Sequence, residues 1–434
     1  MKLFEIITLF FFVIFSVQAA HVHVEWDVVH LTVNRDGYIT RGAIGVNGAL
    51  PIPPVYATVG DTLFLKVHNS LNVSTSIHAH GFFQNGTSYL DGAGMVTQCG
   101  IPPGDTFTYE YYLHQAGTFW LHSHYNHQNA DGLRTPLIIY DRNKSQLPLQ
   151  YDKDILLYVE DWFKQEISLR MEQSSDPTAP FPPPASYPYG LINGINANDS
   201  IPINFVPGKR YRIRLAHIGS TVWFKFSIAG HKLTVIEADG ILSKPLSVDG
   251  IDIGPGQRYS VVVQAMDTNK YNYNFTFIQH AEFVAPAPAR NPHTYTRLIQ
   301  YRKGAPIKTI ATNSSTDFVW LNDVNLQAFD KLAALPVSRT FNMDVISKQP
   351  TDKFPRPELD DYDYETPPLV PTLFTAMTTG DLALNETIYG QNTRARVINA
   401  GDVVEIFLSN LINVDHTMHL HGHAFQIIEY GSSW

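Results

Sequence analysis

Apolar and polar residues alternate in short runs along most of this chain, and a period of two is typical of β-strands that bury one face. The clearest runs are Thr62–Val67, Thr106–Leu113, Tyr211–Leu215, Tyr259–Gln264 and Val403–Leu408. Glycine, proline, asparagine and aspartate separate the runs, as tight turns require. The one candidate for a helix is a short one in Gln165–Gln173. The pattern predicts an all-β fold of sandwiches or Greek-key barrels.

An internal repeat divides the chain. Gly60 and Gly401 each precede a strand-like run, and each is followed 18 residues later by the first histidine of a His-x-His pair. A third copy starts at Gly208, but 18 residues after it stands Phe226. We therefore expect three related units, of which the middle one lacks the histidines and binds no metal.

We place the three domains at residues 21–142, 152–303 and 318–434. With 434 residues, 44% of them hydrophobic, the chain is long and apolar enough for several packed cores. The last domain contains a proline-rich, acidic insertion from Pro350 to Pro371. We interpret it as a solvated loop, the usual state of an acidic run between prolines.

The first 20 residues resemble a secretory signal peptide. Lys2 precedes the apolar stretch Ile6–Val17, which is shorter than a membrane span, and small residues follow it. A retained anchor is the alternative. We expect a mature chain without a membrane span, secreted or held at the cell surface and glycosylated. Its Asn-x-Ser/Thr sequons begin at Asn72, Asn85, Asn143, Asn198, Asn274, Asn313 and Asn385.

Charge and cysteine content restrict the partners. The formal net charge is −9 and no cluster of lysine and arginine occurs, which argues against nucleic acid. The single cysteine is Cys99. In a secreted protein a leftover cysteine indicates either an exposed thiol or a bonding partner outside this chain.

Histidines recur in pairs with one residue between them. The 18 histidines of the chain would form roughly 0.7 such pairs by chance, yet there are five. Side chains two residues apart on an extended strand share a face, so each pair presents two imidazoles together, while His416 points away from His419 and His421. Imidazole suits copper, zinc, iron or nickel. The candidate metal ligands are His78, His80, His122, His124, His416, His419 and His421.

Taken together, these motifs resemble the multicopper oxidases, the family of laccases, ascorbate oxidases and iron-uptake ferroxidases. The resemblance spans nearly the whole chain after the signal sequence. It rests on segments that begin at His78, Asp91, Val96, Gly117, Asp131 and His416 and appear in the order that the family has. Similarity at Val370-Pro-Thr-Leu and Ile388-Tyr-Gly leans toward the fungal ferroxidase-like branch.

The resemblance implies three cupredoxin-like domains and copper as the cofactor. It assigns His78 and His419 to a type 2 copper, and His416 to a type 1 copper. The type 3 copper pair would take His80, His122, His124 and His421. These six cluster histidines should converge between domains one and three, because three adjacent coppers reduce one O2 to water.

The chain also departs from the family pattern. The family's final His-Cys-His motif supplies the type 1 thiolate and the last type 3 ligands, and it does not occur here. By the internal repeat its place would fall beyond Trp434. In the family, the cysteine matching Cys99 is disulfide-bonded to one near the C-terminus. We therefore expect a C-terminally truncated form, inactive as written, with the third domain incomplete.

The reducing substrate stays open between a phenol or aromatic amine and Fe(II). Ferroxidases of this family have an aspartate a few residues before the type 1 histidine. Here that position is Ile412, while Asp415 directly precedes His416. The alternative to an oxidoreductase is a non-catalytic, secreted copper-binding protein. Nothing in the sequence indicates the oligomeric state.

Overall fold

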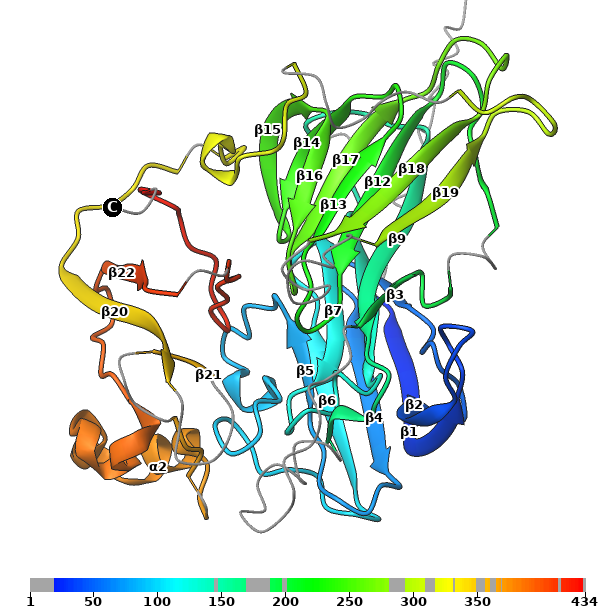
Figure 1. Cartoon of the computed structure of the whole chain (residues 1–434). Coiled ribbons are helices and arrows are strands. Elements are labelled where there is room, and N and C mark those ends of the chain that lie inside the picture. The colour runs from blue at the N-terminus through cyan, green and yellow to red at the C-terminus, as the bar shows by residue number, and fades with distance from the viewer. Residues whose placement is uncertain are drawn as a thin grey trace, which may run out of the picture.

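A computed structural model describes residues 19–143, 147–168, 188–196, 201–280, 293–308, 317–330, 332–348, 356–359, 364–367, 369–412 and 415–431. The expected signal sequence lies almost wholly outside these residues and stays a prediction. Of the expected helix in Gln165–Gln173, only Ile167 and Ser168 are described as helical. No helix in the described part of the chain is both long and apolar enough to cross a bilayer. The molecule is an assembly of β-sheets, which confirms the all-β prediction (Figure 1).

The first unit is a pair of four-stranded sheets packed on a shared apolar core. One sheet has the order β2-β1-β4-β6, with β1 (His21–Val33), β2 (Arg41–Val46), β4 (Thr62–Asn69) and β6 (Thr106–Tyr112). The other has the order β3-β8-β7-β5, with β3 (Val55–Thr58), β5 (Ile77–His80), β7 (Gly117–Ser123) and β8 (Arg134–Tyr140). The one-turn helix η1 (Ser88–Leu90) follows β5. Leu63, Leu65 and Val67 of β4 are fully buried, as the alternating pattern predicts.

The middle unit has a sheet of six strands and a sheet of five, around an aromatic-rich core. The first has the order β10-β9-β12-β17-β14-β15, with β9 (Lys153–Trp162), β10 (Tyr189–Ile192), β12 (Arg210–His217), β14 (Leu233–Ala238), β15 (Ile241–Val248) and β17 (Arg258–Gln264). The second has the order β11-β19-β18-β13-β16, with β11 (Ile203–Asn204), β13 (Phe224–Ile228), β16 (Gly250–Ile253), β18 (Tyr273–Gln279) and β19 (Thr294–Gln300).

The third unit is smaller within the described residues. It has one sheet, in the order β21-β20-β22, with β20 (Arg339–Lys348), β21 (Arg356–Leu359) and β22 (Val404–Asn410). Figure 1 shows this sheet beside the first unit, with the helical segment around α2 at its lower end. Its helical elements are η5 (Asp323–Asn325), α2 (Thr372–Thr378), η6 (Gly380–Leu384), η7 (Glu386–Tyr389) and η8 (Gln391–Thr393). The sequence pattern missed these turns because such short helices give no readable period.

The internal repeat corresponds to one recurring strand arrangement. The strand after each repeat glycine pairs in parallel with the first long strand of its unit: β4 with β1, β12 with β9 and β22 with β20. The glycines hold left-handed backbone, with φ of +88° at Gly60, +72° at Gly208 and +90° at Gly401. A side chain would be strained there, so the turn requires glycine.

The arrangement is less complete around β22. Both β4 and β12 also pair on their other edge with an antiparallel strand, β6 or β17. In the described part of the chain β22 ends its sheet and has no such neighbour. Apolar side chains of β22 are also exposed, with 42% for Ile406 and 57% for Phe407.

Candidate metal centre

Two neighbouring strands of the first unit bring four histidines together. β5 and β7 are antiparallel, and their register sets His78 opposite His122 and His80 opposite Trp120. His78, His80 and His122 are buried. Ring centroids lie 5.3 Å apart for His78 and His122, and 5.5 Å apart for His78 and His124. The alternation of side chains along both strands thus puts the imidazoles on one face.

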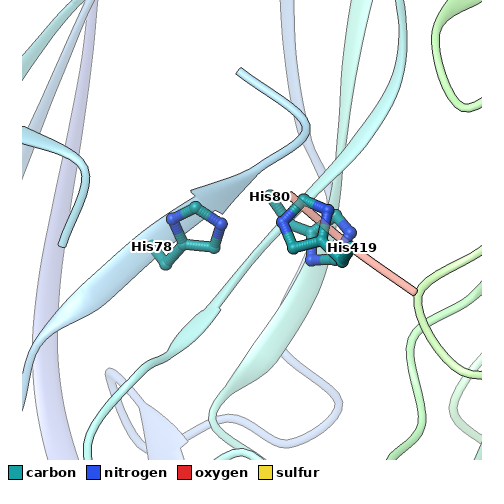
Figure 2. Close-up of side chains that lie close together, drawn as sticks. All are labelled: His78, His80 and His419. Atoms are coloured by element: carbon teal, nitrogen blue, oxygen red, sulfur yellow. The ribbon is translucent and has the colours of Figure 1, made fainter. Parts of the chain in front are cut away.

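The C-terminal histidine segment lies against these strands (Figure 1). His419 stacks on His80 at a centroid distance of 3.7 Å, and His421 stacks on His78 at 4.0 Å. Figure 2 shows the rings of His80 and His419 together, with His78 beside them. The expected convergence of the three histidine pairs is confirmed. The segment pairs with no strand in the described residues, however, so it is not the β-strand that the expectation assumed.

One ring nitrogen of each of three histidines is held by an oxygen acceptor. The Nδ1 of His78 lies 2.7 Å from the backbone oxygen of Asp91, and the Nδ1 of His421 lies 2.7 Å from Oδ2 of the same aspartate. The Nδ1 of His122 lies 2.9 Å from the backbone oxygen of Ser123. Carbonyl and carboxylate partners of this kind orient metal-ligating imidazoles and fix the tautomer.

The opposite nitrogens of two of these histidines have no partner. Among the described residues, the Nε2 atoms of His78 and His122 are buried and form no hydrogen bond, and the same holds for Nε2 of His416 outside the cluster. An unpaired buried polar atom is unfavourable unless a ligand satisfies it. Two groups of side chains have ligand atoms within 4.8 Å of one another: His78 with His80 and His419, and His78 with Asp91 and His421. These orphaned nitrogens fit a site that binds transition metal ions.

Burial disfavours the protonated forms of His78, His80 and His122. It lowers the pKa of His78 and of His122, and together with the charge of Arg258 it holds the pKa of His80 well below its usual value. For Asp91 burial acts the other way, but hydrogen bonds from His421 and His78 outweigh it and lower the pKa. Neutral imidazoles and an ionised carboxylate are the forms that bind metal ions.

Asp91 was missed as a candidate functional residue, although its motif was noted. The sequence feature that could have identified Asp91 is the glycine that follows it. Gly92 has φ of +83°, and a Cβ there would lie 1.8 Å from the backbone oxygen of Ile77. This close approach of the loop to β5 places the Asp91 carboxylate between His78 and His421.

A cavity of about 780 Å³ reaches the cluster from the surface. It is lined by His80, His122, His124, His419 and His421, among others. Trp120, Tyr125 and the backbone around Gly256 form part of its wall. A small molecule can therefore reach the imidazoles, which a closed structural metal site would not allow.

The remaining candidates lie apart from this cluster. His416 belongs to neither group of converging ligand atoms in the described chain. Cys99 is exposed and free. Phe226 is fully buried in the middle unit and packs on Phe277 at 4.9 Å, so the histidine position of the repeat is filled there by apolar core.

Comparison with protein-family models agrees with the family resemblance of the sequence motifs along most of the chain. Models of the multicopper oxidase family match residues 27–144, 153–304 and 365–434. The iron transport multicopper oxidase fetC of Epichloe festucae is 33% identical over 94% of this chain and 65% of its own length. Laccase-2 of Trametes versicolor is 35% identical over 94% of this chain and 78% of its own. The chain thus spans just under two thirds of the length of the first of these relatives.

Comparison with solved structures finds members of the same family. The structure described as Fet3p, a multicopper oxidase that functions in iron import, aligns with a TM-score of 0.84 at 30% identity, covering 94% of this chain and 76% of the other. A laccase from Botrytis aclada aligns with a TM-score of 0.70 at 29% identity, covering 83% of this chain and 67% of the other.

Proposed function

Because this chain belongs to the multicopper oxidase family, we propose that its histidine cluster binds copper and that the protein is an oxidoreductase. The reaction would couple one-electron oxidation of a small reductant to reduction of O2 to water. The observation that supports it best is the convergence of three histidine pairs, in which the Nε2 atoms of His78 and His122 are buried and have no partner among the described residues.

The proposed ligand sets follow the motifs. His78 and His419 would hold the type 2 copper, and His416 the type 1 copper. The type 3 pair would take His80, His122, His124 and His421. Bound copper would supply the one-electron redox chemistry that protein side chains lack. Asp91 would accept hydrogen bonds from His78 and His421 and so keep their Nε2 atoms free to bind.

The cavity beside the cluster gives the proposed O2 site its access. Its wall combines imidazoles with Trp120 and Tyr125, and it reaches His80 and His122 within the buried strands. O2 is small and apolar, so a channel of this kind admits it without a polar recognition group. The proposed reductants are larger and would act at the type 1 site instead.

We propose Fe(II) or a phenol or aromatic amine as the reductant, with the choice between them open. The higher TM-score with Fet3p supports iron. Against it, Ile412 occupies the position where family ferroxidases carry an aspartate, although the exposed Asp415 adjoins His416. Steady-state O2 uptake with Fe(II) and with a phenol, by a form of the protein that carries a type 1 thiolate, would separate the two: a kcat/KM ratio far from one identifies the substrate class.

The protein is proposed to act outside the cell or at its surface. Among the described sequons, Asn72, Asn85, Asn143 and Asn385 are exposed and Asn274 is half-buried, so glycans could be attached without unfolding. Asn198 and Asn313 lie outside the described residues. Glycosidase treatment of the secreted protein, followed by mass measurement, tests this.

A second candidate function is copper binding without catalysis by the chain of residues 1–434. It is favoured by the single thiol: Cys99 is exposed in the first unit, whereas a type 1 centre depends on a copper–thiolate bond. Copper analysis and absorption spectroscopy of the purified 1–434 chain test both candidates. We expect bound copper, no intense blue thiolate band and no turnover of Fe(II) or phenols. A blue chain that consumes O2 at enzymatic rates would reject this second function, and a chain that binds no copper would reject both.

A further inference from the structure

The turn between β16 and β17 of the middle unit reaches the histidine cluster, although it contributes no histidine. The turn spans residues 254–257. The backbone nitrogen of Gly254 donates to Oε1 of Gln257 at 2.8 Å, and the backbone nitrogen of Gly256 donates to the oxygen of His217 at 3.0 Å. The first bond closes the turn on itself, and the second ties it to the end of β12.

The turn contacts both parts of the cluster. Gly256 has φ of +83°, and a Cβ on it would lie 3.2 Å from Cε1 and 3.5 Å from Nε2 of His80. A Cβ on Gly254 would lie 2.5 Å from Cγ2 of Thr417, in the C-terminal histidine segment. Both glycines therefore lack a side chain where the middle unit meets its neighbours, Gly256 beside the first unit and Gly254 beside the third. The imidazole of His80 occupies the space beside Gly256.

Arg258, the first residue of β17, attaches this turn to the first unit. Its Nε donates to the backbone oxygen of Thr118 in β7 at 2.9 Å, and its Nη1 donates to the oxygen of Gly256 at 2.8 Å. The side chain is 3% exposed and pairs with Asp239 at 3.0 Å. A Cβ on Gly81, next to His80, would lie 2.5 Å from Nη2 of Arg258. The guanidinium thus packs between the turn and the strands that carry His80 and His122.

We propose that Gly256 and Arg258 of the middle unit are positioning residues for the copper cluster, Gly256 by leaving room for His80 and Arg258 by fixing the turn against β5 and β7. The proposal rests on the proposed copper function. It explains how a unit without ligands takes part in the site: it supplies the surface that fixes the angle of His80 and the place of the segment carrying His419.

The test is Gly256→Ala in the purified full chain, with Gly208→Ala as the matched control. Gly208 also has positive φ, +72°, and lies in the same unit, but a Cβ there would meet no atom within 4 Å. Both variants carry backbone strain, so both should lower the unfolding midpoint by similar amounts. Only Gly256→Ala should weaken copper binding, by roughly 10-fold or more, the usual effect of disturbing a group that orients metal ligands.

Copper affinity is measured by competition with a chelator, and X-ray absorption at the copper edge reports the ligand geometry of every bound copper. We expect an altered spectrum in Gly256→Ala and an unchanged spectrum in Gly208→Ala. Arg258→Lys keeps the charge and loses the paired donors, so it should also change the spectrum. That result would separate positioning from a purely electrostatic effect.

Each outcome decides between the proposals. If the unmodified chain binds copper and Gly256→Ala binds it equally well with the same spectrum, the positioning role is wrong and the proposed function stands. Equal copper loss in both glycine variants would assign the effect to strain in the middle unit and also overturn the role. If the unmodified chain binds no copper, the proposed function fails and this inference fails with it.

Discussion

Contacts of single residues determine which ring nitrogen of His78, His122 and His421 is available to a metal ion. In the cluster, hydrogen bonds occupy the Nδ1 atoms of His78, His122 and His421, while burial leaves the Nε2 atoms of His78 and His122 unpaired. A buried polar atom without a partner destabilises the folded chain. A metal ion bound to these two nitrogens would remove that destabilisation.

Asp91→Asn tests how much this orientation contributes. An amide has one acceptor oxygen and no charge, so the hydrogen bond to His421 would weaken and a charge near the proposed copper would be lost, while the backbone oxygen that holds His78 is unchanged. We expect copper affinity to fall roughly 10- to 100-fold with little change in fold. Chelator competition measures the affinity, and Asp105→Asn, at an exposed aspartate of the same unit, is the control. Equal affinity in the two variants would count against the role of Asp91.

Buried histidines also make stability depend on pH. Burial lowers the pKa of His78, His80 and His122 below the ordinary value of 6.5. Below pH 6.5 the unfolded chain therefore binds protons that the folded chain does not, and the free energy of unfolding falls as the pH drops. The metal-free chain should melt at progressively lower temperature from pH 7 to pH 5. His122→Asn should reduce this slope, and a slope unchanged by that substitution would contradict the assignment.

At the level of elements, the same strand arrangement occurs in all three units. A left-handed glycine begins the turn, and the strand after it pairs in parallel with the first long strand of the unit. In the first two units an antiparallel strand covers the other edge. The edge of β22 has no such cover within the described residues, and an exposed apolar edge strand favours association with other chains.

Phe407→Lys tests this edge. Phe407 is 57% exposed in the middle of β22, and a lysine there would oppose edge-to-edge pairing. We expect the 1–434 chain to self-associate and the variant to do so several-fold less, as measured by light scattering against concentration. Val73→Lys, at a 45% exposed loop residue of the first unit, should have no such effect. Identical scattering in both variants would show that β22 is not the associating surface.

At the level of the whole molecule, buried ion pairs hold the first unit against the middle unit. Glu160 of β9 is 2% exposed and accepts from Nε of Arg134 at 2.9 Å and from Nη1 of Arg35 at 3.3 Å. Both arginines belong to the first unit. Because the histidine cluster also depends on the middle unit through its β16–β17 turn, this interface fixes the geometry of the site as well as the fold.

Glu160→Gln should therefore be strongly destabilising. It leaves two buried guanidinium groups without their shared carboxylate, a loss of about 3–5 kcal/mol. Asp152→Asn is the control, since it weakens the exposed pair with Lys209, which solvent screens, and should therefore change the free energy of unfolding far less. Thermal or denaturant unfolding compares the two. Similar losses would mean that the buried network contributes no more than a surface pair.

The local features of this protein were determined by the sequence alone. Strand positions, the repeat and the histidine pairs follow from side-chain alternation and from turns that need glycine, which act over a few residues. The motifs also indicated the family, and with it the expected convergence of His78, His80, His419 and His421. The short helices of the third unit could not be read, because they have no period.

Only the tertiary structure decided how the parts of the site meet. The carboxylate of Asp91 lies between His78 and His421 because the loop at Gly92 packs against β5. Gly256 and Arg258 contact the cluster because the middle unit packs against the first. The motif at Asp91 marks the loop but not its partners, and the contacts of Gly256 and Arg258 have no periodic or motif signal. Both depend on surfaces distant in the chain, whose relative position is set by burial of whole sheets and by buried ion pairs between units.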